Sequence, residues 1–163
     1  RNGMLFSPEA WRKYFKPITK QLIDICHAND LPVIYHGCGN ASIIYEDMIE
    51  LGLDFYNPLE AKADLDVVEL EKEYRGRLGF CGNIDMRVLE RNNLDEIKRE
   101  VLYKMQAANT GGWIFQSDHS ISNDVEPESY HHALKVVREY GEYPLDLDKI
   151  RAEIKRLDEK LNS

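Results

Sequence analysis

A short apolar run ends in polar residues that can bind a ligand or take part in catalysis in the stretch Leu31-Pro32-Val33-Ile34-Tyr35-His36-Gly37-Cys38-Gly39-Asn40. Three more apolar runs end in the same way, and a helical pattern follows each of them. They are Leu53–Tyr56 before Asn57-Pro58-Leu59-Glu60, Leu78–Phe80 before Gly82-Asn83-Ile84-Asp85, and Trp113–Phe115 before Ser117-Asp118-His119-Ser120. Alternating strands and helices indicate a parallel α/β sheet. Because such sheets place their sites at the C-terminal ends of the strands, the four endings predict one shared site.

Helical patterns surround these runs. The first begins at Ser7, a good N-cap residue followed by Pro8, and Pro17 should kink or divide it. We expect the remaining helices at 42–51, 63–74, 93–108 and 127–140, and strands at 31–35, 53–56, 78–84 and 113–116. The predicted order is therefore one helix followed by four βα units with right-handed crossovers.

The segment 145–163 differs from the rest of the chain. Its apolar residues step by three and four between charged ones, which predicts an amphipathic helix: Leu147, Ile150, Ile154, Leu157 and Leu161. About two heptads are too few for a coiled coil. Packing on its own domain is favoured over packing on a partner.

Bulk composition narrows the class of protein. A chain of 163 residues is about one domain, and its formal net charge of −8 argues against a nucleic-acid partner. No apolar run approaches the roughly 18 residues of a membrane span, and no signal peptide is evident. Three cysteines favour a reducing, cytoplasmic compartment over a disulfide framework. The start at Arg1, ahead of Met4, suggests a piece of a longer gene product.

His36 and Cys38 form the sharpest candidate metal pair. Two residues apart in an extended segment, they point to the same side, and imidazole with thiolate suits Zn(II). A catalytic zinc takes three protein ligands, so a third must come from another strand. The alternative is a buried cysteine beside a hydrogen-bonded histidine at a strand end.

His119 is the best candidate for the third ligand, because its strand ends in the same plane. Asp118 beside it could ligate instead, or orient a ligating imidazole. Cys81 is a rival that lies within its strand and is equally explained as core. A turn that caps the following loop is the alternative for Asp118 and His119.

Further polar residues stand at the second and third strand ends. Asn83 and Asp85 lie two apart, and Asp85 could bind a substrate hydroxyl or amine or act as a general base. Glu60 could point into the site, and Asn57 and Asn83 are candidate cofactor-binding residues. The alternatives are a helix cap for Asp85 and a solvated loop position for Glu60.

As a set, these motifs resemble the uroporphyrinogen decarboxylase superfamily, and most closely its corrinoid-linked methyltransferase branch. The resemblance runs from Leu5 to about Pro144. It rests on Leu5-Phe6-Ser7-Pro8-Glu9-Ala10-Trp11, Pro17, His36-Gly37-Cys38-Gly39-Asn40, Gly52-Leu53-Asp54, Gly82-Asn83-Ile84-Asp85, Gly111-Gly112-Trp113-Ile114-Phe115 and Ser117-Asp118-His119-Ser120-Ile121.

The resemblance implies a fold. The family has a TIM barrel of roughly twice this length, and the four βα units match its C-terminal half. Residues 1–144 would then be half of a (βα)8 barrel, and 145–163 an added amphipathic helix. A half barrel exposes two sheet edges and its interior, so we expect a homodimer or pairing with a missing N-terminal half.

The resemblance also implies chemistry. The methyltransferase branch binds zinc through a His-x-Cys, matched by His36 and Cys38, and a later Cys, where this chain has His119. Asp118, Asp85 and Glu60 would orient ligands or a small-molecule substrate, while a corrinoid would arrive on a partner protein. A tetrapyrrole decarboxylase is the second reading: it carries a histidine after the last strand, as His119 does, but lacks the His-x-Cys. A self-associating, inactive half barrel is the third.

Overall fold

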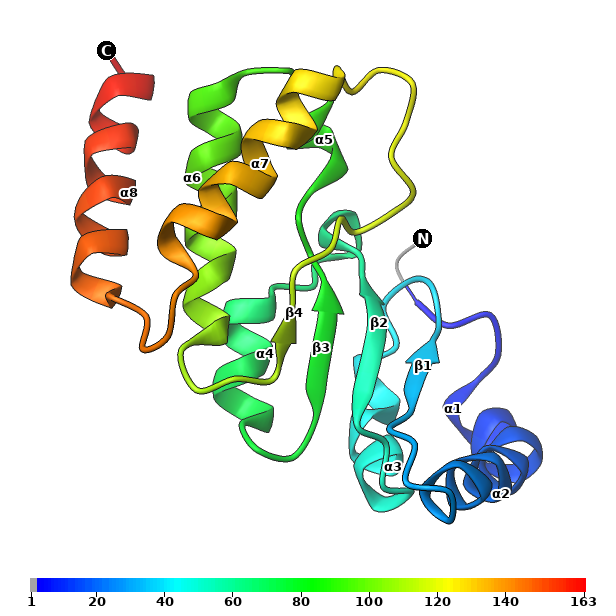
Figure 1. The fold of residues 1–163 in the computed structure, drawn as a ribbon. Coiled ribbons are helices and arrows are strands. Elements are labelled where there is room, and N and C mark those ends of the chain that lie inside the picture. The colour runs from blue at the N-terminus through cyan, green and yellow to red at the C-terminus, as the bar shows by residue number, and fades with distance from the viewer. Residues whose placement is uncertain (1–2) are drawn as a thin grey trace.

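A computed structural model describes residues 3–163 and shows four parallel strands alternating with helices (Figure 1). The strands are β1 (Ile34–His36), β2 (Phe55–Leu59), β3 (Gly79–Gly82) and β4 (Trp113–Ile114), and they pair in chain order. The predicted α/β class is therefore confirmed. The arrangement is that of part of a TIM barrel, with β1 and β4 at the two edges of the sheet.

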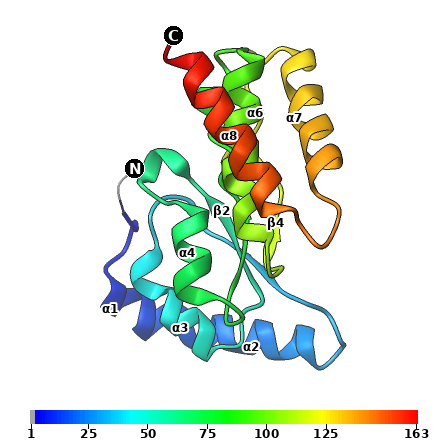
Figure 2. The same ribbon diagram turned by 90° about the vertical axis from the view of Figure 1, so that its left-hand side faces the viewer.

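Helices precede, connect and follow the strands. They are α1 (Pro8–Ala10), α2 (Lys16–His27), α3 (Tyr45–Glu50), α4 (Val67–Tyr74), α5 (Met86–Leu89), α6 (Leu94–Met105), α7 (Pro127–Tyr140) and α8 (Leu147–Leu161). Figure 2 shows α6, α7 and α8 grouped together, with α3 and α4 lower in the view. No helix within residues 3–163 is both long and apolar enough to cross a membrane.

The first helix is interrupted ahead of Pro17, as predicted. Ser7 caps it by accepting a hydrogen bond from the backbone N–H of Ala10. A π-helical turn, Trp11–Phe15, then separates α1 from α2, with the Lys16 N–H donating to the Trp11 carbonyl. Since proline has no N–H to donate and its ring crowds the preceding turn, the helix widens here.

The first strand begins three residues later than predicted, because the preceding amides are used elsewhere. The Leu31 N–H donates to the carbonyl of Cys26 at the end of α2, and Pro32 has no N–H. The Val33 N–H donates to the side chain of Asp54. The parallel ladder to β2 therefore starts at Ile34 and runs to His36.

The boundaries of four other predicted elements also shift. The second strand covers Phe55–Leu59 rather than 53–56, with a register irregularity between Tyr56 and Leu59. The third ends at Gly82, and the fourth is only Trp113–Ile114, followed by an isolated bridge from Ile84 to Ser117. The helix predicted to begin at residue 63 begins at Val67, after a 3-10 turn that ends at Asp64 in a left-handed conformation.

Aromatic side chains fill the core between the sheet and its helices. Tyr35, Tyr56 and Phe80 lie in register on neighbouring strands, and Tyr45 packs against the latter two at ring-centroid distances of 4.8 and 5.8 Å. The opposite face, which would line a closed barrel, is open: Ile34 is 53% exposed and Ile114 is 41% exposed. The partner that would cover this face stays a prediction.

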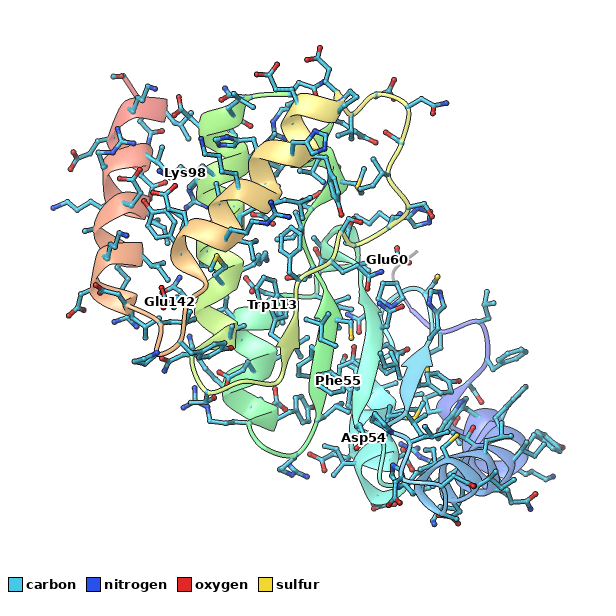
Figure 3. All side chains as sticks on the ribbon, in the orientation of Figure 1. Asp54, Phe55, Glu60, Lys98, Trp113 and Glu142 are labelled. Atoms are coloured by element: carbon cyan, nitrogen blue, oxygen red, sulfur yellow. The ribbon has the colours of Figure 1, made fainter. Side chains whose placement is uncertain are left out.

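The C-terminal helix packs on α6. Ile150 and Leu157 are buried in one apolar cluster with Ile97 and Leu102 of α6. Beside this contact, Glu153 of α8 binds Lys98 of α6 at 2.7 Å, where Figure 3 labels Lys98. Both side chains are mostly shielded, at 17% and 20% exposed.

We expect Glu153→Gln to lower the free energy of unfolding at neutral pH by about 1 kcal/mol. The effect is this small because the partner Arg156 is exposed, so solvent screens the ion pair. The hydrogen bond from Arg156, with Lys98, lowers the pKa of Glu153 from its usual 4.5 to about 2. A lowered folded-state pKa stabilises above the unfolded value and loses this effect as the pH falls. The difference in unfolding free energy from wild type should therefore shrink between pH 4.5 and 2. Urea titrations across this range measure it, with exposed Glu159→Gln as the control. A difference that is independent of pH would contradict the assignment.

Candidate functional site

His36 and Cys38 lie together at the C-terminal end of β1. Both side chains are exposed at this edge of the sheet, and His36 Nε2 is 3.5 Å from Cys38 Sγ. The other ring nitrogen, Nδ1, is 2.8 Å from Oδ1 of Asn57 at the neighbouring position of β2. The pair is thus accessible from solvent on one side and supported by the sheet on the other.

Asn57 is buried and makes a second contact, across the sheet. Its Nδ2 donates to Oε1 of Gln116, just beyond β4, at 2.8 Å. Gln116 was not among the residues predicted for the site. Its position was nevertheless informative, because it is the last residue of the predicted fourth strand and lies two residues before Asp118.

Glu60 directly follows β2, where Figure 3 labels it. It is only 4% exposed, so the solvated loop alternative is wrong. Its Oε1 accepts from the Gly39 N–H at 3.1 Å, and its carboxylate also meets the Cys38 thiol and, at 3.3 Å, Lys62. Burial raises the pKa of Glu60, but the Gly39 amide and Lys62 outweigh it and lower the pKa below its usual range. The Glu60 carboxylate is therefore in direct contact with the cysteine.

Asp118 joins the loops that follow β2 and β3. It is 1% exposed; its Oδ2 accepts from the Ala61 N–H at 3.0 Å and its Oδ1 from the Met86 N–H at 3.1 Å. Burial raises the pKa of this carboxyl, against the lowering effect of the Met86 amide. Asp118 thereby fixes the position of Ala61, which follows Glu60, and connects the strand ends to one another.

Asn83 and Asp85 are both engaged in local structure at the end of β3. Asn83 is fully buried: Oδ1 accepts from the Val67 N–H, and Nδ2 donates to the carbonyls of Leu59 and Leu65. Asp85 caps α5 through the Arg87 N–H, in line with the helix-cap alternative, and pairs with the Arg87 guanidinium. Burial raises the pKa of Asp85, but Arg87 reverses this and lowers it overall.

The structure does not bring His119 to the pair on β1. Asp118 points into the protein, whereas His119 is exposed, and its carbonyl accepts from the Ser117 hydroxyl at 2.7 Å. Within residues 3–163, no three His, Cys, Asp or Glu side chains gather in a way that could hold a metal. The predicted convergence of all three ligands is therefore absent from this arrangement.

Two of the three expected zinc donors nevertheless fit. Zn–N and Zn–S bonds of about 2.0 and 2.3 Å at a tetrahedral angle separate the two donor atoms by about 3.5 Å. His36 Nε2 and Cys38 Sγ lie at this separation. A metal here would also find its histidine supported through Nδ1, as ligating histidines commonly are.

The parallel βα units with polar strand ends define part of a TIM barrel. The chain belongs to the uroporphyrinogen decarboxylase (URO-D) family, whose model matches residues 1–140. A comparison with curated proteins gave no match. Among solved structures, a methyltransferase from Methanosarcina mazei is similar, with a TM-score of 0.67 and 18% identity. The match covers 85% of this chain and 39% of that one, so the chain spans about two fifths of its length.

Proposed function

We propose that this chain is part of a zinc-dependent methyltransferase that moves a methyl group between a corrinoid and a thiol or similar acceptor. The observation that carries the proposal is the 3.5 Å separation of His36 Nε2 and Cys38 Sγ at a barrel strand end. The family, and the fold that the chain shares with a methyltransferase, support it.

His36 and Cys38 would hold the metal, and His119, which lies apart from the pair in this structure, is proposed as the third ligand. Bound zinc would supply Lewis acidity that lowers the pKa of an acceptor thiol. The residues of the chain itself position the site. Glu60 fixes the Cys38–Gly39 turn through a hydrogen bond, and Asp118 fixes Ala61, the residue after Glu60, in the same way. Asp85, which caps α5 and is kept ionised by Arg87, would orient a small-molecule substrate. The corrinoid would be carried by a partner protein.

We expect the purified protein, after incubation with zinc and dialysis, to retain about one zinc per chain. His36→Ala and Cys38→Ser should each reduce the zinc content to near zero, because each removes a donor of the pair. Elemental analysis measures the metal. His119→Ala should also lose zinc if this residue completes the site.

Cys26→Ser is the matched control, since Cys26 lies on α2, away from the strand ends, and its loss should leave the zinc content unchanged. Wild-type protein that binds no zinc even after reconstitution would refute the proposal. Equal zinc loss in the control would show that the metal is bound non-specifically through thiols.

Tetrapyrrole decarboxylation is the second candidate, favoured by the family whose model the chain matches. It needs no metal and would use His119 at the mouth of the barrel. Titration with a porphyrin, followed by absorbance, separates the two functions. Tetrapyrrole binding without zinc binding would favour decarboxylation.

A further inference from the structure

We propose that Gln116 and Asn57 are positioning residues that fix the ring tautomer of His36, so that its unprotonated Nε2 faces Cys38. This inference rests on the proposed zinc role of the pair and deepens it. The three residues form a chain of hydrogen bonds across the C-terminal ends of the strands, from the end of β4 to β2 and on to β1.

The direction of each hydrogen bond follows from the atoms that meet. His36 Nδ1 faces the oxygen of the Asn57 amide at 2.8 Å, and an amide oxygen can only accept. Nδ1 must therefore carry the ring proton. Because a neutral imidazole has one N–H, Nε2 is left with its lone pair, directed at Cys38 Sγ.

The contact with Gln116 matches the way the Asn57 amide faces. A rotated Asn57 would present its NH2 group to His36 and favour the opposite tautomer. The Asn57 Nδ2 instead donates to Gln116 Oε1 at 2.8 Å, and this leaves Oδ1 for His36. Since Asn57 is buried, water does not compete freely for either end of its amide.

The connection is specific to the three-dimensional fold. The strands β2 and β4 do not pair with each other, because each pairs with β3. The Asn57–Gln116 hydrogen bond therefore crosses over β3 and joins residues 59 positions apart in the chain. A nitrogen can ligate a metal only through a free lone pair, and loss of such a supporting partner typically lowers metal affinity about 10–100-fold.

The test is the tautomer itself, read by NMR of 15N-histidine-labelled, metal-free protein at about pH 8.5. We expect wild-type His36 to carry its proton on Nδ1. Gln116→Lys places a donor where the acceptor was, so Asn57 should rotate and move the proton to Nε2. Gln116→Glu, of similar length, keeps an acceptor and should keep the wild-type tautomer. Gln116 is exposed, so both variants should fold.

A second variant pair tests Asn57 directly. Asn57→Asp keeps an oxygen beside Nδ1 and should retain the tautomer, whereas Asn57→Leu removes it and should give a mixture. Titration with Co²⁺, followed through thiolate absorbance, should show binding about 10–100-fold weaker in Gln116→Lys and Asn57→Leu.

The outcomes separate this inference from the proposed function. Two results would contradict the proposed control of the tautomer, whether or not metal binds. One is wild-type His36 protonated on Nε2, and the other is a tautomer that is the same in Gln116→Lys and Gln116→Glu. If the tautomers are as expected but the wild type binds neither Co²⁺ nor zinc, the control of the tautomer is supported and the metal site is refuted.

Discussion

Asp118→Ala should lower the free energy of unfolding by about 3 kcal/mol, because it leaves two backbone N–H groups in the strand-end loops without their acceptor. Asp118→Asn should lower it by about 2 kcal/mol, since only one oxygen remains and the new NH2 group faces a second donor. Chemical denaturation of both variants measures the effect.

The comparison with Asp124→Asn tests the explanation. Asp124 is exposed in the loop before α7, and its substitution should change stability by less than about 0.5 kcal/mol. An Asp118→Asn variant as stable as the wild type would show that the two backbone contacts do not hold the loops. Asp118 would then be available for a direct role with substrate or metal.

Asn83→Ala should have a still larger effect, about 4 kcal/mol. The substitution removes hydrogen bonds to three backbone groups in a fully buried position. It also places alanine at a φ of 81°, which asparagine tolerates better than residues without a polar side chain. Urea denaturation measures the loss.

Asn83→Gly separates these two causes. Glycine adopts positive φ without strain, so this variant should be about 1 kcal/mol more stable than Asn83→Ala while it still lacks the hydrogen bonds. Asn123→Ala, at an exposed loop position, is the control and should change little. Equal stability of the glycine variant and the wild type would contradict the buried hydrogen-bond role.

Both residues illustrate what sequence patterns can predict about a site. Their position after parallel strands correctly indicated that they lie at the same edge of the sheet. The pattern could not tell a residue that faces a ligand from one that holds the loops, because both need polar atoms at a strand end. In the structure, Asn83 and Asp118 use these atoms on the backbone of neighbouring loops.

The same limit applies to the metal ligands. Extended backbone makes residues two apart point to one side, which was sufficient to predict the proximity of His36 and Cys38. His119 is exposed, whereas the carboxylate of its neighbour Asp118 is buried and fixed by loops from two other strands, which no pattern of spacing predicts. Gln116 stands at the end of the predicted fourth strand, but its contact with Asn57 became evident only once the fold had brought β4 across from β2.

The sequence by itself determined the parallel βα order, the helix cap at Ser7, and the interruption before Pro17, because apolar periodicity, capping and proline chemistry are local. Only the tertiary structure decided which polar strand-end residues are buried as supports and which reach solvent. That choice depends on hydrogen bonds between segments distant in the chain, such as Asp118 to Ala61 and Asn57 to Gln116, and no local pattern encodes them.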